Sequence, residues 1–520
     1  MQTSSKKRVL PTTIPFWTQV LDAGAITTQI ASSPCPGTGT EEDPFIVTWL
    51  LPHDPRNPQN IPTRKKWLIT FIAALETFIV TLVSSAYSGA ITQIKTQFHV
   101  PTETATLGVS LYVLGFALGP LIWAPCSELF GRQVVFIGTY GFLTVFCAAS
   151  VAAQNMHTLL VLRFLAGAFG SSPFANSGGV IADMFSARER GLALTAFVSA
   201  PLLGPIVGPI AGGFLGMEAG WRWVMGLLAI LCALLWVLGA VLKPETYAPV
   251  LLRRRAETLT SLTGRVHRSQ WDVDQGRVSL QAAMKRAFSR PLRMLFIEPI
   301  VLLLSVYLAI VYGTLYLLFG AFPIVYQVHR GWNQGVAALP FLGVLGGMML
   351  AILYAVVDHR RYVALSKRLG GYAPPEARLP PCMVASVALT GGLFWFAWTN
   401  SPSTHWLVSV AAGVPFGFGM ILVFFSVLNY LIDSYTIFAA SALAANTVLR
   451  SLFGFAFPLF TTYMFEGLGL HWAACVPAFL ALACVPFPFW FYKKGVEIRT
   501  RSQISAQSEV FVQSMIQNMR

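Results

Sequence analysis

A chain of 520 residues that is 55% hydrophobic and only 11% charged, with a net charge of +14, is not composed like a soluble protein. This composition is typical of a polytopic membrane protein. The basic residues lie between apolar segments rather than along one face, which argues against nucleic-acid binding. The seven cysteines are scattered without a CxxC pair, so we expect neither disulfides nor a metal site, and no cofactor motif is visible.

The first 66 residues are polar, rich in Pro, Thr and Ser, and contain few periodic apolar positions. No basic segment leads directly into a short apolar run, so a cleaved signal peptide is not expected. The composition predicts a mostly disordered cytosolic tail over 1–66. The first membrane span should then act as its own insertion signal.

Apolar windows long enough to cross about 30 Å of hydrocarbon follow in two sets of six. They lie at 67–90, 104–126, 133–153, 159–182, 192–216, 221–242, and then at 296–320, 334–357, 382–400, 404–431, 436–465 and 470–491. We therefore predict an all-α polytopic fold of twelve transmembrane helices. Its parts are an N-terminal half at 67–242, a basic central loop at 243–295, a C-terminal half at 296–491 and a tail at 492–520. Equal halves joined in this way are typical of a parallel repeat.

The distribution of Lys and Arg predicts the orientation. Of the 36 such residues, 31 lie in the tails and in the loops on one side, whereas only Lys95, Arg222 and Arg330 lie on the other. This bias predicts that both termini are cytosolic. The central loop belongs to the basic side and contains Arg253–Arg255, which either form an anionic-lipid surface or simply belong to a positive-inside linker.

Two ionisable residues are expected at hydrocarbon depth in the first half. Arg163 lies in the fourth span, where a charge is costly unless it faces a polar interior. Glu76 lies about ten residues past Lys66, roughly 15 Å deep. We interpret Arg163 and Glu76 as candidates for proton coupling. The alternative for Glu76 is a structural carboxyl group that bonds to a neighbouring helix.

The fifth span contains the run GPIVGPIAGGF, with glycine at Gly204, Gly208 and Gly212 on one helix face. Glycines at this spacing allow close backbone approach. Three prolines, at Pro201, Pro205 and Pro209, each remove one helical hydrogen bond. We expect the face that ends at Gly213 to pack against another helix and to set how tightly the halves close.

The loop between the second and third spans places Glu128 and Arg132 four residues apart, with Gly131 between them. Such a pair either latches helix ends in one conformation or is an ordinary interfacial ion pair. In the second half, polar and aromatic side chains are candidates for an apolar substrate pocket with a few polar anchors. These are Tyr307, Tyr312, Tyr316, Asn429, Tyr430, Asn446 and Arg450. Arg450 alternatively extends to the interface.

These motifs resemble the major facilitator superfamily. Glu128, Gly131 and Arg132 are similar to its loop motif, Arg163–Gly167 to its fourth-helix motif, and Gly204–Gly213 to its fifth-helix antiporter motif. Further stretches are similar to the fungal twelve-span drug:proton antiporter branch, among them DPRNP, SSPFANSGGVIADMF, PETYAPVLLRRRA, NYLIDSY and AASALAANTVLRSLFG. The resemblance extends from about residue 50 to 495. Gln133 departs from it, because it stands where the loop motif has a second basic residue.

The resemblance implies a rocker-switch transporter. In such a transporter Gly204–Gly213, including Pro205 and Pro209, supports efflux, and Arg163 lies near the proton and substrate pathway. It also implies that Glu128 and Arg132, together with Asp183, stabilise the outward-facing state.

We predict a proton-coupled exporter, not an enzyme, for hydrophobic or amphipathic organic compounds such as drugs, fungicides or secondary metabolites. Its partners are expected to be that substrate, the proton and membrane lipid, with the chain acting as a monomer. The plasma membrane is the expected location, with the vacuolar membrane as the alternative. A second hypothesis is an uptake permease or polyamine transporter of the same fold, and a third is a receptor that transports nothing.

Overall fold

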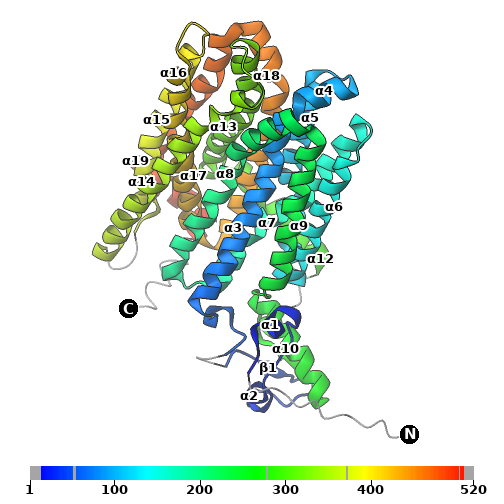
Figure 1. Cartoon of the computed structure of the whole chain (residues 1–520). Coiled ribbons are helices and arrows are strands. Elements are labelled where there is room, and N and C mark those ends of the chain that lie inside the picture. The colour runs from blue at the N-terminus through cyan, green and yellow to red at the C-terminus, as the bar shows by residue number, and fades with distance from the viewer. Residues whose placement is uncertain (1–12, 51–53, 277–278, 370–372, 503, 509–520) are drawn as a thin grey trace.

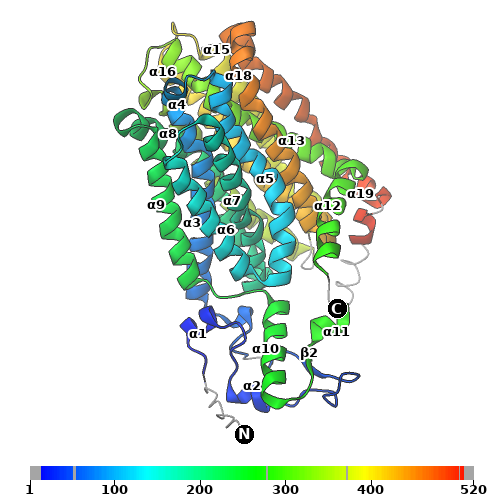
Figure 2. The ribbon, with the colours of Figure 1, turned by 90° about the vertical axis from the view of Figure 1, so that its right-hand side faces the viewer.

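Helices account for nearly all of the computed structural model, which describes residues 13–50, 54–276, 279–369, 373–502 and 504–508 (Figures 1 and 2). Eleven helical segments of this described part are long and apolar enough to cross a membrane. They form one elongated bundle, and a smaller group of short elements lies below one end of it (Figure 1). We call the bundle end nearest that group the base.

The first half of the bundle consists of long helices that pack mainly on one another. They are α3 (Thr63–Ala86), α5 (Thr102–Phe130), α6 (Arg132–Val151), α7 (Met156–Met184), α8 (Ala187–Ala219) and α9 (Trp221–Leu242). The turn η2 (Tyr87–Ala90) continues α3 into the short α4 (Ile91–Phe98). Within this half α3 packs on α8, α5 packs on α7, and α6 contacts both α7 and α9.

The second half repeats this organisation. It contains α13 (Pro299–Phe322), α14 (Phe341–Arg368), α15 (Pro380–Thr399), the short α16 (Trp406–Ala411), α17 (Gly413–Ser434), α18 (Ala439–Cys484) and α19 (Pro486–Arg501). Short turns connect them at η3 (Pro323–Val328), η4 (Val336–Ala338), η5 (Pro375–Arg378) and η6 (Thr436–Phe438). Here α13 packs on α18, and α17 packs on both α14 and α15.

The longest helix, α18, contains two membrane crossings. Gly469 has φ 74° and ψ 173°, a conformation that interrupts the helix and that glycine adopts readily. The His471 ring lies 2.7 Å from the carbonyl oxygen of Ala397, at the end of α15 farther from the base, whereas Arg499 pairs with Glu376 at the base. The chain therefore turns back at Gly469. With this reversal, the eleven segments give twelve crossings and confirm the predicted fold class.

Two predicted boundaries were too short because helices continue beyond the apolar windows. The eighth window was predicted to end at residue 357, but α14 continues to Arg368, and the twelfth was predicted to end at 491, but α19 continues to Arg501. Basic residues lie in the last turn of both helices and interact favourably with the helix dipole there. Part of the predicted C-terminal tail is thus helical.

The prediction of a disordered N-terminal tail was wrong for the residues that the structure describes. They form α1 (Phe16–Leu21), α2 (Thr28–Ser32), the strand β1 (Phe45–Val47) and the turn η1 (Pro58–Asn60). The central loop forms α10 (Ala248–Thr263), the strand β2 (His267–Ser269), α11 (Gln270–Gln275) and α12 (Leu280–Ile297). Strands β1 and β2 pair in parallel. Residues 1–12 and 509–520 of the predicted tails lie outside the described part.

The tail and the central loop lie together below the bundle (Figure 2). There they share a small core and a buried ion pair. Asp54 accepts hydrogen bonds at 2.7 and 2.8 Å from Arg255, whose side chain is 3% exposed. Burial alone would raise the pKa of Asp54, but the hydrogen bonds and charge of Arg255 hold it below its usual value. This pairing explains the order of a segment whose own composition predicts disorder.

Each arginine of the Arg253–Arg255 run has an acidic partner. Arg253 pairs with Asp272 at 2.7 Å and Arg254 lies 3.8 Å from Glu257. Together with the pairing of Arg255 to Asp54, these contacts give the run a role within the tail and loop. They do not favour the anionic-lipid surface as its main role.

Candidate functional site

Arg163 is buried in the first half and is held by backbone carbonyl groups. Its guanidinium donates hydrogen bonds to Val83 O and Gly108 O, both at 3.0 Å, and to Ser84 O at 3.2 Å. The rings of Tyr87 and Tyr112 also pack against it, with centroids 4.8 and 4.5 Å from the guanidinium carbon. Arg163 thus ties α7 to α3 and α5.

Glu76 lies on α3 and is completely buried. Lys243, the residue that follows α9, donates to Glu76 Oε2 at 2.6 Å, while Oε1 has no hydrogen-bond partner among the described residues. A buried carboxylate with an unpartnered oxygen, paired with a single lysine, is a group whose charge state depends on that lysine. Sequence reasoning selected Glu76 but did not include Lys243.

The structure does not bring Arg163 and Glu76 together. Arg163 contacts α3 at Val83 and Ser84, seven or eight residues from Glu76, which corresponds to about 10–12 Å along the helix axis. The two proton-coupling candidates therefore have separate partners, although Arg163 contacts the helix that carries Glu76.

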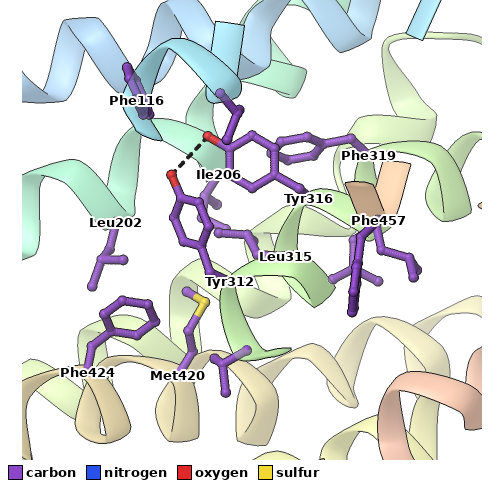
Figure 3. Packing of buried hydrophobic residues seen from close by; sticks show 14 of the residues in the cluster. Phe116, Leu202, Ile206, Tyr312, Leu315, Tyr316, Phe319, Met420, Phe424 and Phe457 are labelled. Atoms are coloured by element: carbon purple, nitrogen blue, oxygen red, sulfur yellow. Dashed lines mark hydrogen bonds between the residues drawn. The ribbon is translucent and has the colours of Figure 1, made fainter. Parts of the chain in front are cut away.

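Two tyrosines of the second half join the halves at the middle of the bundle. Ser84 Oγ lies 2.8 Å from Tyr316 OH, and Tyr312 OH donates to Tyr316 OH at 3.3 Å (Figure 3). Figure 3 also shows Phe116, Leu202 and Ile206 of the first half around this pair. Because Arg163 bonds to the carbonyl group of Ser84 and Tyr316 to its hydroxyl group, Ser84 connects Arg163 to the Tyr316–Tyr312 pair.

Arg450 lies next to Tyr312 of this pair, on α18. The ring centroid of Tyr312 lies 4.8 Å from its guanidinium carbon, that of Phe174 lies at 4.9 Å, and that of Phe424 at 5.6 Å. Arg450 is 5% exposed, so the expected alternative of a side chain that extends to the interface is wrong. Asn446, one helical turn earlier, is also buried.

The remaining pocket candidates lie elsewhere. Tyr307 is five residues before Tyr312, which places it on a different face of α13. The side-chain amide of Asn429 donates to Phe425 O of its own helix, and the ring of Tyr430 packs near Phe491 of α19. These three side chains do not join the cluster around Arg450.

The glycine face of α8 packs within the first half. A Cβ atom at Gly204 or Gly208 would overlap Thr81 or Ser85 of α3, and one at Gly212 would overlap the carbonyl oxygen of Ala86. Two parts of the run reach the second half: Ile206 lies beside the Tyr312–Tyr316 pair (Figure 3), and the Phe214 ring lies against Gly335. The glycine face thus packs against α3, and its expected control over how tightly the halves close stays a prediction.

At the base, Arg132 pairs with Asp183 rather than with Glu128. Its Nε lies 3.1 Å from Asp183 Oδ2, and its Nη1 donates to Ser127 Oγ at 3.1 Å. Glu128 is exposed. The pair that four-residue spacing predicts is absent because the loop turns at Gly131, where φ is 105° and the α5 helix ends.

Glu245, which sequence reasoning missed, organises the same loop. Its carboxylate accepts from the backbone N–H groups of Arg132 and Gln133 at 3.0 and 3.1 Å, and from those of Thr246 and Tyr247 at 2.9 and 2.8 Å. A carboxylate at the first turn of α6 also interacts favourably with the helix dipole. The sequence feature that could have identified Glu245 is its position in the stretch PETYAPVLLRRRA, which resembles the family.

Gln133, the departure from the family motif, connects this loop to the N-terminal tail. Its side-chain amide donates to Val20 O at 2.8 Å and to Lys243 O at 2.9 Å. Nearby, burial raises the pKa of Tyr247 to about 12, with the charge of Glu128 adding to the effect, so its phenol stays neutral. The tail, the loop and the end of α9 thus meet at one point.

Replacement of Glu245 by glutamine is expected to destabilise the base. An amide has a single acceptor oxygen, so buried N–H groups at the start of α6 would lose their partner, which costs about 1–3 kcal/mol. The purified E245Q protein should therefore unfold at a lower temperature than the wild type. E257Q, which changes an exposed glutamate on α10, is the matched control, and equal melting temperatures for the two variants would contradict this role.

The second half contains a comparable set of ion pairs at the base. Arg378 Nε lies 2.9 Å from Asp433 Oδ2, so the loop before α15 is tied to α17 as the loop before α6 is tied to α7. Arg499 Nε lies 2.9 Å from Glu376 Oε1 and attaches α19 to the same loop. Among the described residues no group of three His, Cys, Asp or Glu side chains is placed to hold a metal ion.

Two halves of membrane-crossing helices, each with ion-paired loops at one end and meeting around buried polar groups, define a multi-pass membrane transporter. The description Major Facilitator Superfamily belongs to the family model that matches residues 70–458. The chain belongs to the major facilitator superfamily, which confirms the predicted family and the class of transporter rather than enzyme.

Relatives match over nearly the whole chain. The "Major facilitator superfamily multidrug transporter mdrA" of Aspergillus fumigatus is 60% identical over 511 residues, which is 98% of this chain and 84% of that protein. The "MFS-type efflux pump MFS2" of Trichophyton rubrum is 59% identical over 511 residues, which is 98% of this chain and 86% of that protein. A solved structure, the "Partially occluded inward open conformation of the xylose transporter XylE from E. coli", matches with a TM-score of 0.59 at 15% identity, and covers 82% of this chain and 99% of XylE.

Proposed function

We propose that this protein exports small hydrophobic or amphipathic organic compounds by proton-coupled alternating access. The observation that carries the proposal is the match over 98% of the chain to relatives named as a multidrug transporter and an efflux pump. The contact between the halves supports it, because rings and aliphatic side chains surround Tyr312 and Tyr316 there (Figure 3). Such surroundings suit apolar molecules better than sugars, which need many polar partners.

For proton coupling, we propose the Glu76–Lys243 pair. A proton that neutralises the Glu76 carboxylate would break its ion pair with Lys243 and free the end of α9 from α3. The membrane potential contributes about 2.3 kcal/mol per charge per 100 mV to such a step. Arg163, held by three carbonyl groups, would keep α7, α3 and α5 together during the cycle and transmit movement to Tyr316 through Ser84.

For conformational control, we propose the Arg132–Asp183 pair together with Glu245. These contacts hold the loop between α5 and α6 against α7 and the end of α9. Their rupture would let the first half open at the base. Glu128, which is exposed, has no place in this latch.

The base is proposed to face the cytosol, which places both termini there, because 31 of the 36 Lys and Arg residues belong to that side. A single chain contains both halves, so a monomer suffices for transport. The plasma membrane is the proposed location, since export from the cell requires it, and fluorescence microscopy of a tagged protein distinguishes it from the vacuolar membrane.

Accumulation of a fluorescent drug in cells with and without the protein tests the direction of transport. Export predicts several-fold lower accumulation when the protein is present, and a protonophore should abolish the difference. Higher accumulation in cells that contain the protein would instead support an uptake permease.

A further inference from the structure

Arg450 is a buried cation without a buried anion. It is 5% exposed, yet none of the ion pairs among the described residues includes it, and its Nε has no hydrogen-bond partner there. The three aromatic rings around it attract a cation, and the one acceptor that they carry, the Tyr312 hydroxyl, is bonded to Tyr316 instead. A guanidinium in such surroundings lacks the partner that normally offsets the loss of water.

Arg163 is a similarly buried arginine of the same protein whose guanidinium does have hydrogen-bond acceptors. Two tyrosine rings pack against its guanidinium as well, but three backbone carbonyl oxygens accept its hydrogen bonds at 3.0 to 3.2 Å. Both arginines are therefore surrounded by aromatic rings, but only Arg163 has hydrogen-bond acceptors among the described residues. The guanidinium of Arg163 is bonded to the protein backbone, whereas that of Arg450 is free to bind a ligand.

Asn446 gives a second, independent sign of a missing ligand. It is 1% exposed, and neither its Nδ2 nor its Oδ1 has a hydrogen-bond partner among the described residues. It precedes Arg450 by four residues on α18, so the two side chains lie on the same helix face. Buried polar side chains are rarely left without partners, and two neighbours in this state indicate a binding site.

We propose that the central site binds organic anions, with a carboxylate paired to Arg450 and hydrogen-bonded by Asn446, and with an apolar or aromatic body packed on Phe174, Tyr312 and Phe424. Arginine pairs with a carboxylate through short, charge-assisted hydrogen bonds, often two at once. The rings that now cover the guanidinium are suited to an aromatic body. This substrate class rests on the proposed export function and narrows it.

The arrangement also explains how the anion would reach a side chain that is now covered. Phe174 belongs to α7 of the first half, whereas Tyr312, Phe424 and Arg450 belong to the second half. When the halves part in alternating access, Phe174 moves away and one face of the guanidinium is uncovered. The ligand would then replace the ring of Phe174 as the group that faces Arg450.

Binding to the purified full-length protein tests this assignment with a matched pair of probes. Fluorescence anisotropy would compare pyrenebutyrate with its neutral primary amide, which has the same aromatic body without the charge. The wild type is expected to bind the carboxylate at least tenfold more tightly than the amide. R450Q should weaken binding of the carboxylate far more than binding of the amide and so remove this preference, and R450K should keep part of it.

R368Q removes the same charge from an exposed position on α14 and should retain the full preference. N446A should reduce the preference by a smaller factor than R450Q. Equal binding of the two probes by the wild type, or an unchanged preference in folded R450Q, would overturn the assignment. Melting curves establish that R450Q is folded, and if it is not, R450K and N446A carry the test. Export of neutral drugs without a carboxylate preference would refute this inference alone, whereas failure to transport any compound would refute the proposed function.

Discussion

E76Q is expected to abolish proton-driven export, by more than tenfold, and to lower the stability of the protein. The glutamine amide does not ionise at physiological pH, and it leaves the Lys243 ammonium buried without its partner. Removal of one member of a buried ion pair costs about 3–5 kcal/mol. Transport by the purified variant in vesicles and its thermal unfolding measure the two effects.

A double variant separates these two effects. E76Q/K243M contains no buried charge at this position, so its melting temperature should recover toward that of the wild type while export remains absent. E466Q, which changes an exposed glutamate on α18, is the matched control for the loss of a carboxylate. Normal export by a stable E76Q/K243M protein would show that the pair is structural.

The substitution G212A is expected to have the second large effect. A Cβ atom at Gly212 would overlap the Ala86 carbonyl oxygen, so α8 and α3 would have to separate. Overpacking of this kind costs about 1–3 kcal/mol or more. The melting temperature should fall, and export should fall with it because the α3 helix also carries Glu76 and the carbonyl partners of Arg163.

The same substitution at an open position provides the control. A Cβ atom at Gly138 of α6 would meet no atom within 4 Å, and alanine favours a helix over glycine by about 0.5–1 kcal/mol. G138A should therefore be neutral or slightly more stable. Equal effects of G212A and G138A would mean that close approach of α8 to α3 does not matter.

The sequence allowed the twelve crossings to be predicted because each crossing is a local property, namely a run of apolar residues of sufficient length. The alternation of basic loops then restricted the number of crossings to an even one. Even Gly469, where α18 reverses, falls in the gap between the last two predicted windows. The ends of α14 and α19 could not be predicted from the sequence, because the last helical turns of both lie beyond the apolar run.

The partners of the ionisable residues could not be predicted in the same way. Lys243 meets Glu76 across 167 positions of sequence, and Arg255 meets Asp54 across 201. Such contacts depend on how the helices are rotated and on how distant segments dock, and neither is encoded in local spacing. Spacing instead favoured Glu128 for Arg132, and the turn at Gly131 directs Arg132 to Asp183.

The pocket candidates illustrate the same limit. Seven side chains were selected by residue type alone. In the structure Tyr312, Tyr316 and Arg450 form one connected cluster, and Asn446 lies one helical turn from Arg450 on α18. The other three, Tyr307, Asn429 and Tyr430, lie outside this cluster. The partners of the cluster from the first half, Ser84 and Phe174, could not be predicted, because nothing in the sequence distinguishes them from the many other serines and phenylalanines.

The central claim is that a proton gradient drives export through this chain, and the most direct measurement uses purified protein in vesicles with an imposed pH gradient. A fluorescent organic substrate should accumulate in vesicles that are acidic inside, with a matching outflow of protons that a pH dye records. A protonophore should abolish this accumulation, and E76Q/K243M should not support it. Accumulation that is independent of the gradient, or substrate movement in the same direction as the protons, would contradict the proposed antiport.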